Sequence, residues 1–124
     1  MKERTDASGG PGAVLEQAAG AFERLADDAD VLAVGVGIAG QCDTAQGVVL
    51  RGPNLFWPNV PFRDRLSERI GLKVTMRNDV VMSTVGEHRH GAGRGVRDMV
   101  MLFVGTGIGG GAIVGGRLLE GSNG

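Results

Sequence analysis

The chain of 124 residues carries 13 basic and 14 acidic side chains, which gives a formal net charge of −1 at pH 7. This balance offers no excess positive charge to nucleic acid or to an anionic membrane, so we expect neither as a partner. The length allows at most one ordinary domain, and a single cysteine, Cys42, excludes an internal disulfide framework. No apolar run reaches the roughly 20 residues of a membrane span, so we expect a soluble, cytoplasmic protein.

The first third of the chain predicts a tail, a helix and a strand. Residues 1–11 lack hydrophobic periodicity and are expected to be a disordered tail. From Ala13 to about Asp28, apolar residues recur at spacings of three and four, which predicts an amphipathic helix covering a sheet. Residues 31–38 are continuously apolar, as in a strand buried on both faces, and a turn follows at 39–41.

The rest of the chain alternates between strand and helix patterns. A short strand is predicted over 47–50, and three prolines within 52–61 predict a loop. The spacing predicts a helix over 62–70 that Gly71 ends, a strand over 73–76 and a helix from Val80 to about His88. Strands are predicted at 99–104, 112–114 and 117–119. This order favours an α/β protein with a mainly parallel sheet that ends in an antiparallel hairpin.

Residues 105–111, with the sequence GTGIGGG, lie between two predicted strands. Glycine leaves successive backbone amides open, and Thr106 adds a hydroxyl donor, so such a turn can hold the phosphates of a nucleotide. The spacing also satisfies the GxGxxG dinucleotide fingerprint, but that fingerprint needs a helix directly afterwards, and residues 112–114 favour a strand. Taken alone, a purely structural hairpin explains the run equally well.

Asn78 and Asp79 stand at a predicted strand-to-helix junction, at the carboxyl end of a strand where α/β proteins place their ligands. Either residue can simply cap the helix that follows. The functional alternative is that Asp79 is a general base that accepts a hydroxyl proton.

Two other polar groups carry no predicted site. His88 and His90 are two residues apart on a helix end, so they do not face each other, and no metal site is predicted there. Arg89, Arg94 and Arg97 are scattered around a glycine-rich connection and are expected to form a solvated face.

Five segments together resemble the ROK family in order and spacing. They are GVGIAG at 35–40, GPNLFW at 52–57, Asn78-Asp79, GEHRHGAGRG at 86–95 and the glycine run at 105–111. Over roughly residues 30–124 the chain is similar to the middle of a ROK sugar kinase of the glucokinase type. The resemblance implies an incomplete actin-like ATPase (ribonuclease H-like) fold. After the tail, residues 12–97 would form part of the N-terminal lobe and residues 98–124 the start of the C-terminal lobe.

The resemblance also implies roles for individual residues. Asp79 matches the catalytic base that activates a sugar hydroxyl for attack on the γ-phosphate of ATP, with Mg²⁺ as the accompanying ion. The positions that match sugar contacts are Gly40, Asn54 and Asn78. The positions that match the phosphate-binding turn are Gly105, Thr106, Gly107, Gly109 and Gly110. The implied reaction is phosphorylation of a hexose, glucose by analogy, in a protein that is a homodimer or homotetramer when full length.

The sequence departs from the family pattern in three ways. It lacks the Asp-x-Gly-Gly-Thr phosphate motif, and it lacks both the Gly-Glu-Ile-Gly-His segment and the cysteine-rich zinc site. Arg77 replaces the usual glutamate, and we expect it to point away from Asp79, because a nearby guanidinium would weaken that base. We therefore expect the 124 residues alone to be inactive and to expose unpaired strand edges and apolar faces.

A second class of function stays open at this point. The family also contains sugar-responsive transcriptional repressors, which share Asn78-Asp79 and carry a helix-turn-helix upstream. The polar first residues and the near-neutral charge offer no DNA-binding footprint, and the complete GTGxGGG turn favours a kinase.

Overall fold

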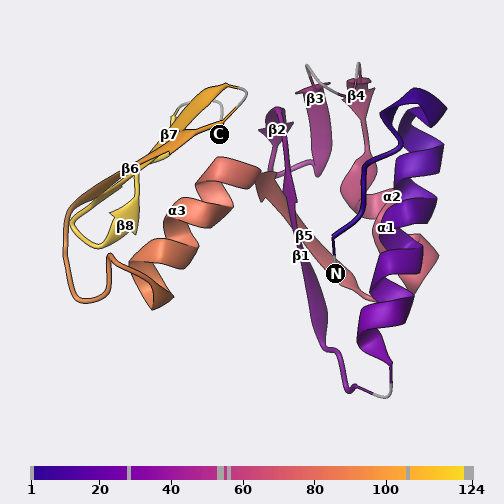
Figure 1. Ribbon diagram of the computed structural model, residues 1–124, viewed down its shortest axis with the longest axis horizontal. Helices are drawn as coiled ribbons and strands as arrows, with labels where there is room; N and C mark the ends of the chain where they lie inside the picture. Colours follow the sequence, from indigo (N-terminus) through magenta and orange to yellow (C-terminus); the bar gives the residue numbers. More distant parts are fainter. Residues whose placement is uncertain (1, 28, 53–54, 56, 106, 122–124) are drawn as a thin grey trace.

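The computed structural model describes residues 2–27, 29–52, 55, 57–105 and 107–121. Its elements in chain order are η1 (Ala7–Gly9), α1 (Gly10–Ala26), β1 (Ala33–Ile38), β2 (Gln41–Asp43), β3 (Val48–Gly52), β4 (Trp57–Val60), α2 (Phe62–Ile70), β5 (Lys73–Asn78), α3 (Asp79–His90), β6 (Met99–Val104), β7 (Ile108–Val114) and β8 (Arg117–Leu118). Figure 1 shows α3 between two groups of elements. Strands β1–β5 with α1 and α2 lie on one side of it, and the β6–β7–β8 sheet lies on the other.

The chain begins with more structure than its sequence pattern predicts. A 3₁₀ turn covers Ala7–Gly9, and α1 starts at Gly10, with Pro11 in its first turn, a position that proline favours. The Gln17 side chain accepts a hydrogen bond from the backbone N–H of Asp6 and donates one to the carbonyl of Arg4. The structure thus places residues 7–11 of the expected tail in helical turns, and side-chain hydrogen bonds connect Arg4 and Asp6 to α1.

Only one pair of strands in the described residues is parallel. Strands β1 and β5 pair in parallel from Ala33↔Lys73 to Ile38↔Asn78, whereas β2–β3–β4 and β6–β7–β8 are antiparallel sheets. The expectation of a mainly parallel sheet is therefore wrong. Strand β1 is also covered on one face only, since its residues alternate between exposed and partly buried positions up to Ile38.

Strand β4 lies inside the segment that its prolines marked as a loop. Pro58 pairs with Arg51 of β3, and β4 is the edge strand of its sheet. An edge strand has a neighbouring strand on one side only, so it can contain a residue that has no backbone N–H. This position explains how a proline-containing strand forms here.

The buried core lies between the two helices α1 and α2 and the strands β1, β3, β4 and β5. Phe62 and Leu66 of α2 are buried, as the three- and four-residue spacing predicts, and the Phe62 ring stacks on Trp57 with 5.4 Å between ring centres. Gly71 ends α2 in the left-handed conformation, also as predicted. No helix within the described residues is both long and apolar enough to span a membrane.

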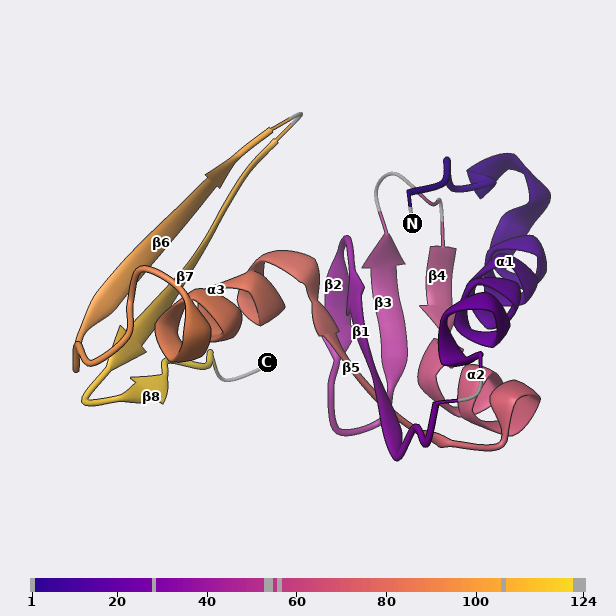
Figure 2. The same ribbon diagram turned by 60° about the horizontal axis from the view of Figure 1, so that its bottom comes forward.

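The β6–β7 hairpin presents two different faces. One face packs against α3 through Gly109 and Gly111. The opposite face exposes four large apolar side chains: Val100 (73 %), Leu102 (72 %), Val104 (75 %) and Ile108 (80 %). Figure 2 shows the hairpin running alongside α3 with this other face free of any neighbouring element. The exposed apolar face expected from the sequence is thus present.

Candidate functional site

The junction between β5 and α3 is built by the side chain of Asn78. Its Oδ1 accepts hydrogen bonds from the backbone N–H groups of Val80 (3.0 Å) and Val81 (3.1 Å), which caps α3 as predicted. Its Nδ2 donates a 3.0 Å hydrogen bond to the carbonyl of Gly40. One side chain therefore starts the helix and ties it to the bend that follows β1.

Gly40 occupies that bend in a conformation that other residues rarely adopt. Its φ is +132°, and a Cβ atom there would overlap the carbonyl oxygen of Arg51 and lie 3.0 Å from the Cα of Gly52. Glycine is therefore required at this position for the fold itself, whatever it binds. The structural requirement and the sugar contact implied by the family resemblance fall on the same residue.

Asp79 is the first residue of α3, and its carboxylate is exposed. Its Oδ1 accepts a 3.0 Å hydrogen bond from the N–H of Val80, and a negative charge is favoured at this end of a helix. On its other side, a Cβ atom on Gly37 would come within 3.3 Å of the Asp79 Cα, so this glycine lets α3 start directly over β1. The Asp79 side chain is thus held at the C-terminal end of the parallel strands β1 and β5.

A cavity of about 240 Å³ lies beside this junction. It brings together Gly40 and Asn78, two of the three residues predicted to contact sugar. The third, Asn54, lies outside the described residues. The other lining residues come from β2, from the β5–α3 junction and from the segment after β7, and they are Gln41, Cys42, Thr44, Arg77, Val81, Leu118, Leu119, Glu120 and Gly121.

The Cys42 thiol lies in the wall of this cavity, and its pKa is raised. Burial is the larger cause that raises the pKa of Cys42, and the negative charge of Asp79 raises it further. No local sequence pattern predicts this interaction, since Cys42 and Asp79 are far apart in the chain.

The expectation that Arg77 points away from Asp79 stays a prediction, and the structure shows the Arg77 side chain in contact with an acidic residue. Its Nη1 forms an ion pair with the carboxylate of Glu120, which lies in the segment after β8. Both residues line the cavity, from opposite parts of the chain. Glu120 was not singled out from the sequence, because nothing in a separation of 43 residues indicates a contact.

The glycine run forms a hairpin between two strands. The N–H of Gly105 donates a 2.9 Å hydrogen bond to the carbonyl of Gly107, and both residues are exposed, whereas Thr106 lies outside the described residues. The chain then enters strand β7 at Ile108, not a helix, which excludes the dinucleotide fingerprint.

Gly109 and Gly110 belong to strand β7 and not to the turn. Strand β7 starts at Ile108, four residues before the start of the strand predicted at 112–114. A Cβ atom on Gly109 would lie 2.8 Å from the Cγ2 of Val80, so this residue is a packing position against α3. A Cβ atom on Gly110 would lie 3.1 Å from the carbonyl of Met101. Because Gly109 touches Val80, the tip of the hairpin projects beyond the same end of α3 at which Asp79 lies (Figures 1 and 2).

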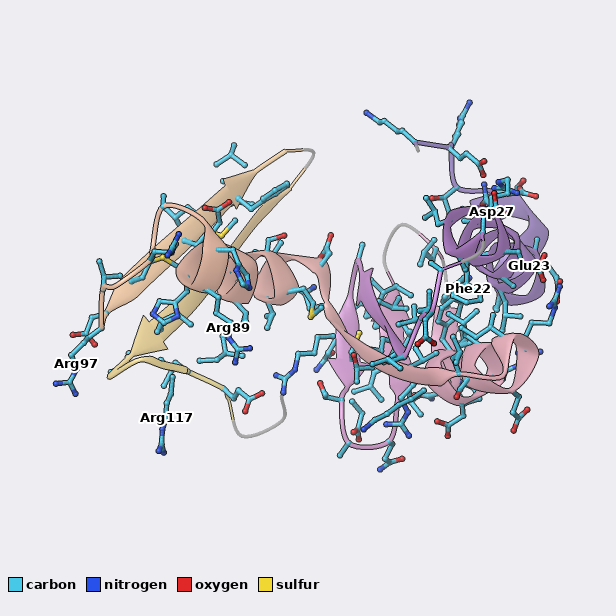
Figure 3. The ribbon with its side chains drawn as sticks, turned by 90° about the horizontal axis from the view of Figure 1, so that it is seen from below. Phe22, Glu23, Asp27, Arg89, Arg97 and Arg117 are labelled. Carbon is cyan, nitrogen blue, oxygen red and sulfur yellow. The ribbon has the colours of Figure 1, made fainter. Side chains whose placement is uncertain are left out.

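The side chains of Glu87 and His88, near the end of α3, contact the loop that follows the helix. The Nε2 of His88 is 2.9 Å from the carbonyl of Val96, and the Glu87 carboxylate accepts the N–H of Ala92, so both side chains hold the following loop. No group of three potential metal ligands occurs among the described residues. Figure 3 shows Arg89, Arg97 and Arg117 on different elements and without a common point of convergence.

The fold defines the class of protein first. The structure superimposes on the ROK family glucokinase from Streptomyces griseus, solved in complex with glucose and AMPPNP, with a TM-score of 0.86 and 37 % identity. The match covers 90 % of this chain and 36 % of that one. This chain therefore has part of the actin-like ATPase fold found in ROK sugar kinases.

The family model described as "ROK family" matches residues 9–124, and the chain belongs to the ROK family. It is 34 % identical over 111 residues to the glucokinase of Streptomyces coelicolor, a match that covers 90 % of this chain and 35 % of that protein. It is also 35 % identical over 94 residues to the xylose repressor of Caldicellulosiruptor bescii, covering 76 % and 24 % of the two chains. The chain spans about a third of the length of the curated glucokinases it matches.

Proposed function

We propose that the protein containing this chain transfers the γ-phosphoryl group of ATP to a hydroxyl of a hexose, and that the hexose is glucose. The observation that carries the proposal is the placement of an exposed carboxylate, Asp79, beside a cavity and at the same end of α3 as a glycine hairpin. The similarity to a glucokinase whose structure holds glucose and AMPPNP supports it.

In this proposal the chain supplies the base and part of each binding site. Asp79 accepts the proton of the attacking hydroxyl, while Asn78 and Gly40, with Asn54, contact the hexose. The hairpin with Gly105, Thr106, Gly107, Gly109 and Gly110 contacts the phosphates through backbone amides and one hydroxyl. Positioning and charge neutralisation are the main requirements of phosphoryl transfer, so these groups act chiefly by holding the reactants.

Mg²⁺ enters the proposal as the ion carried by ATP. In this proposal phosphate oxygens and water supply most of the ligands of the ion. When bound, the ion neutralises charge on the transferred phosphoryl group. Asn78 and the hairpin amides then need only orient the two substrates.

The test uses the whole gene product, meaning the polypeptide of the uninterrupted reading frame that contains these 124 residues. We expect Asp79→Asn to lower kcat for hexose phosphorylation by a factor of about 10² to 10⁴, the range typical of a lost general base. ATP affinity, measured by calorimetry, should change by less than about twofold because Asp79 does not bind the nucleotide. Asp30→Asn, at an exposed position away from the cavity, is the matched control. Full turnover by the Asp79 variant would refute the assignment.

A sugar-sensing repressor is the second candidate, favoured by the similarity to the xylose repressor. It predicts that the whole gene product binds a sugar without phosphorylating it and binds DNA through a segment upstream of these residues. Hexose-dependent ADP release, measured in a coupled assay, separates the two candidates.

We also propose that the 124 residues alone are inactive, since two of the family's binding motifs do not occur in the sequence. Hexose-dependent ATP turnover by the purified chain would overturn this. For the whole gene product we propose a cytoplasmic homodimer or homotetramer, which sedimentation can test.

A further inference from the structure

The ion pair between Arg77 and Glu120 joins two residues that line the same cavity as Asn78 and Gly40. Arg77 is the residue directly before Asn78, at the end of β5, and Glu120 lies two residues after β8. Both side chains line the cavity. The pair therefore connects the end of β5, two residues before the proposed base, to a segment from the far end of the chain.

The segment around Glu120 forms one wall of the cavity. Leu118, Leu119 and Gly121 line it together with Glu120, and the other lining residues come from β2 and its neighbours and from the β5–α3 junction. Of these four residues only Leu118 belongs to a strand, and it pairs with Ile113. The backbone N–H of Leu119 is bonded to the carbonyl of Ala112, and the chain beyond it has no further strand partner among the described residues. The Arg77–Glu120 ion pair adds a side-chain contact near the end of this wall.

The backbone position and the charge of Arg77 allow it to hold the segment around Glu120. Its side chain starts from a residue whose backbone is held in the β1–β5 pair, opposite Gly37, so one end of the contact is rigid. Its charge is matched by Glu120, and the two side chains are 35 % and 50 % exposed, respectively. A partly exposed pair stabilises folding little, so its main effect is to select one position of the wall over others.

We propose that Arg77 and Glu120 are positioning residues that form a strap across the cavity and hold its far wall in place for hexose binding. The inference rests on the proposed function, and it adds two residues that the family resemblance did not assign to the site. The strap acts on hexose affinity, while the carboxylate of Asp79 and the hairpin remain as they are. Loss of the strap should therefore raise KM for the hexose and leave kcat and KM for ATP nearly unchanged.

The experiment is a charge-reversal cycle in the whole gene product. We expect Arg77→Glu and Glu120→Arg each to raise the hexose KM, and the hexose Kd measured by calorimetry, about three- to fivefold, the upper range for a partly exposed pair. The double variant restores the pair with reversed charges and should return both values to within about twofold of the unaltered protein. The kcat should stay within about twofold throughout.

Two control variants carry the same charge changes elsewhere. Arg65→Glu and Glu68→Arg alter exposed residues of α2 that do not line the cavity, and neither should change the hexose Kd. Thermal unfolding of every variant separates a loss of folding from a loss of binding. Increasing salt should weaken hexose binding by the unaltered protein more than by Arg77→Glu, because only the former has an attractive pair to screen.

The outcomes distinguish the strap from the proposed function. If the unaltered protein binds hexose but the two single effects simply add in the double variant, the strap is refuted and the function stands. If the unaltered protein binds no hexose, the proposed function is refuted and the strap with it. Restored binding in the double variant, with unchanged kcat, supports both.

Discussion

Asp79 is exposed and Cys42 is buried, yet the charge of the first acts on the second. Burial, and then the negative charge of Asp79, raise the pKa of the Cys42 thiol above its ordinary value. This link provides a way to test the geometry of the junction without any assumption about function.

The first prediction concerns the reactivity of Cys42, the one cysteine of the chain. Asp79→Asn removes a negative charge that raises the thiol pKa, so the pH midpoint of alkylation by iodoacetamide should move to lower pH. Burial, the larger cause, persists, so the midpoint should stay above that of the unfolded chain. The pH dependence of the alkylation rate, followed by mass spectrometry, measures both. An unchanged midpoint, or the same shift in Asp30→Asn, would mean that Asp79 is not near the cavity wall.

Asn78 has two roles that substitutions can separate. Asn78→Ser keeps an oxygen that can cap α3 but is too short to replace the bond to the Gly40 carbonyl, whereas Asn78→Ala loses both. We expect the alanine variant to be less stable than the serine variant by about 1 kcal/mol, the usual contribution of a helix cap. Denaturant unfolding followed by Trp57 fluorescence measures the difference. Equal stabilities would show that the cap contributes nothing here.

At the scale of elements, α3 and β7 can pack closely because the β7 residues at their contact are glycines, which have no side chain. Gly109 lies against Val80, and Gly111 lies against Thr84, one turn further along the helix. Thr84 is fully buried, and its hydroxyl donates a 2.8 Å hydrogen bond to the carbonyl of Val80. Part of the glycine run thus serves helix packing and part of it forms the open turn, a division that periodicity could not reveal.

This packing yields a prediction on stability. In Gly111→Ala the new Cβ atom would overlap the buried Thr84 side chain, and we expect a loss of about 1–3 kcal/mol in the free energy of unfolding. Gly12→Ala in α1 meets no atom within 4 Å and should gain about 0.5–1 kcal/mol by helix propensity. Denaturant unfolding of the two variants compares the same chemical change at a packed and an open position. If Gly111→Ala lost no stability, the close contact between α3 and β7 would be wrong.

The element boundaries show what local sequence could predict. Helix α2 and strand β6 have the predicted bounds, because a stripe of apolar residues and a glycine stop, or an uninterrupted apolar run, specify them locally. Strand β4 was missed because its formation depends on an edge position beside β3, which no local pattern contains. The short strand β2 was missed for the same reason, since its partner β3 creates it.

At the scale of the whole molecule, α3 packs against β1 and β5 on one side and against the β6–β7 hairpin on the other (Figure 1). The hairpin leaves Val100, Leu102, Val104 and Ile108 exposed on the face that points away from α3. Four neighbouring apolar side chains on a sheet favour self-association of the isolated chain.

The prediction at this scale is that Leu102→Lys reduces self-association of the 124-residue chain, measured by static light scattering as a function of concentration. A charge in the middle of the apolar face repels a second copy that would pack there. Leu25→Lys makes the same change at a comparably exposed leucine of α1, outside this face, and should have little effect. Equal reductions by both variants would show that net charge, and not this face, controls association.

The sequence by itself determined the family, most helices and strands, the cap at Asn78 and the hairpin nature of the glycine run. These features depend on neighbouring residues, on turn chemistry and on motifs in a fixed order. Only the tertiary structure decided that Asn78 meets Gly40, that Arg77 meets Glu120 and that the charge of Asp79 raises the pKa of Cys42. Such pairs form between residues that are distant in the chain, and chain folding, not local spacing, brings them together.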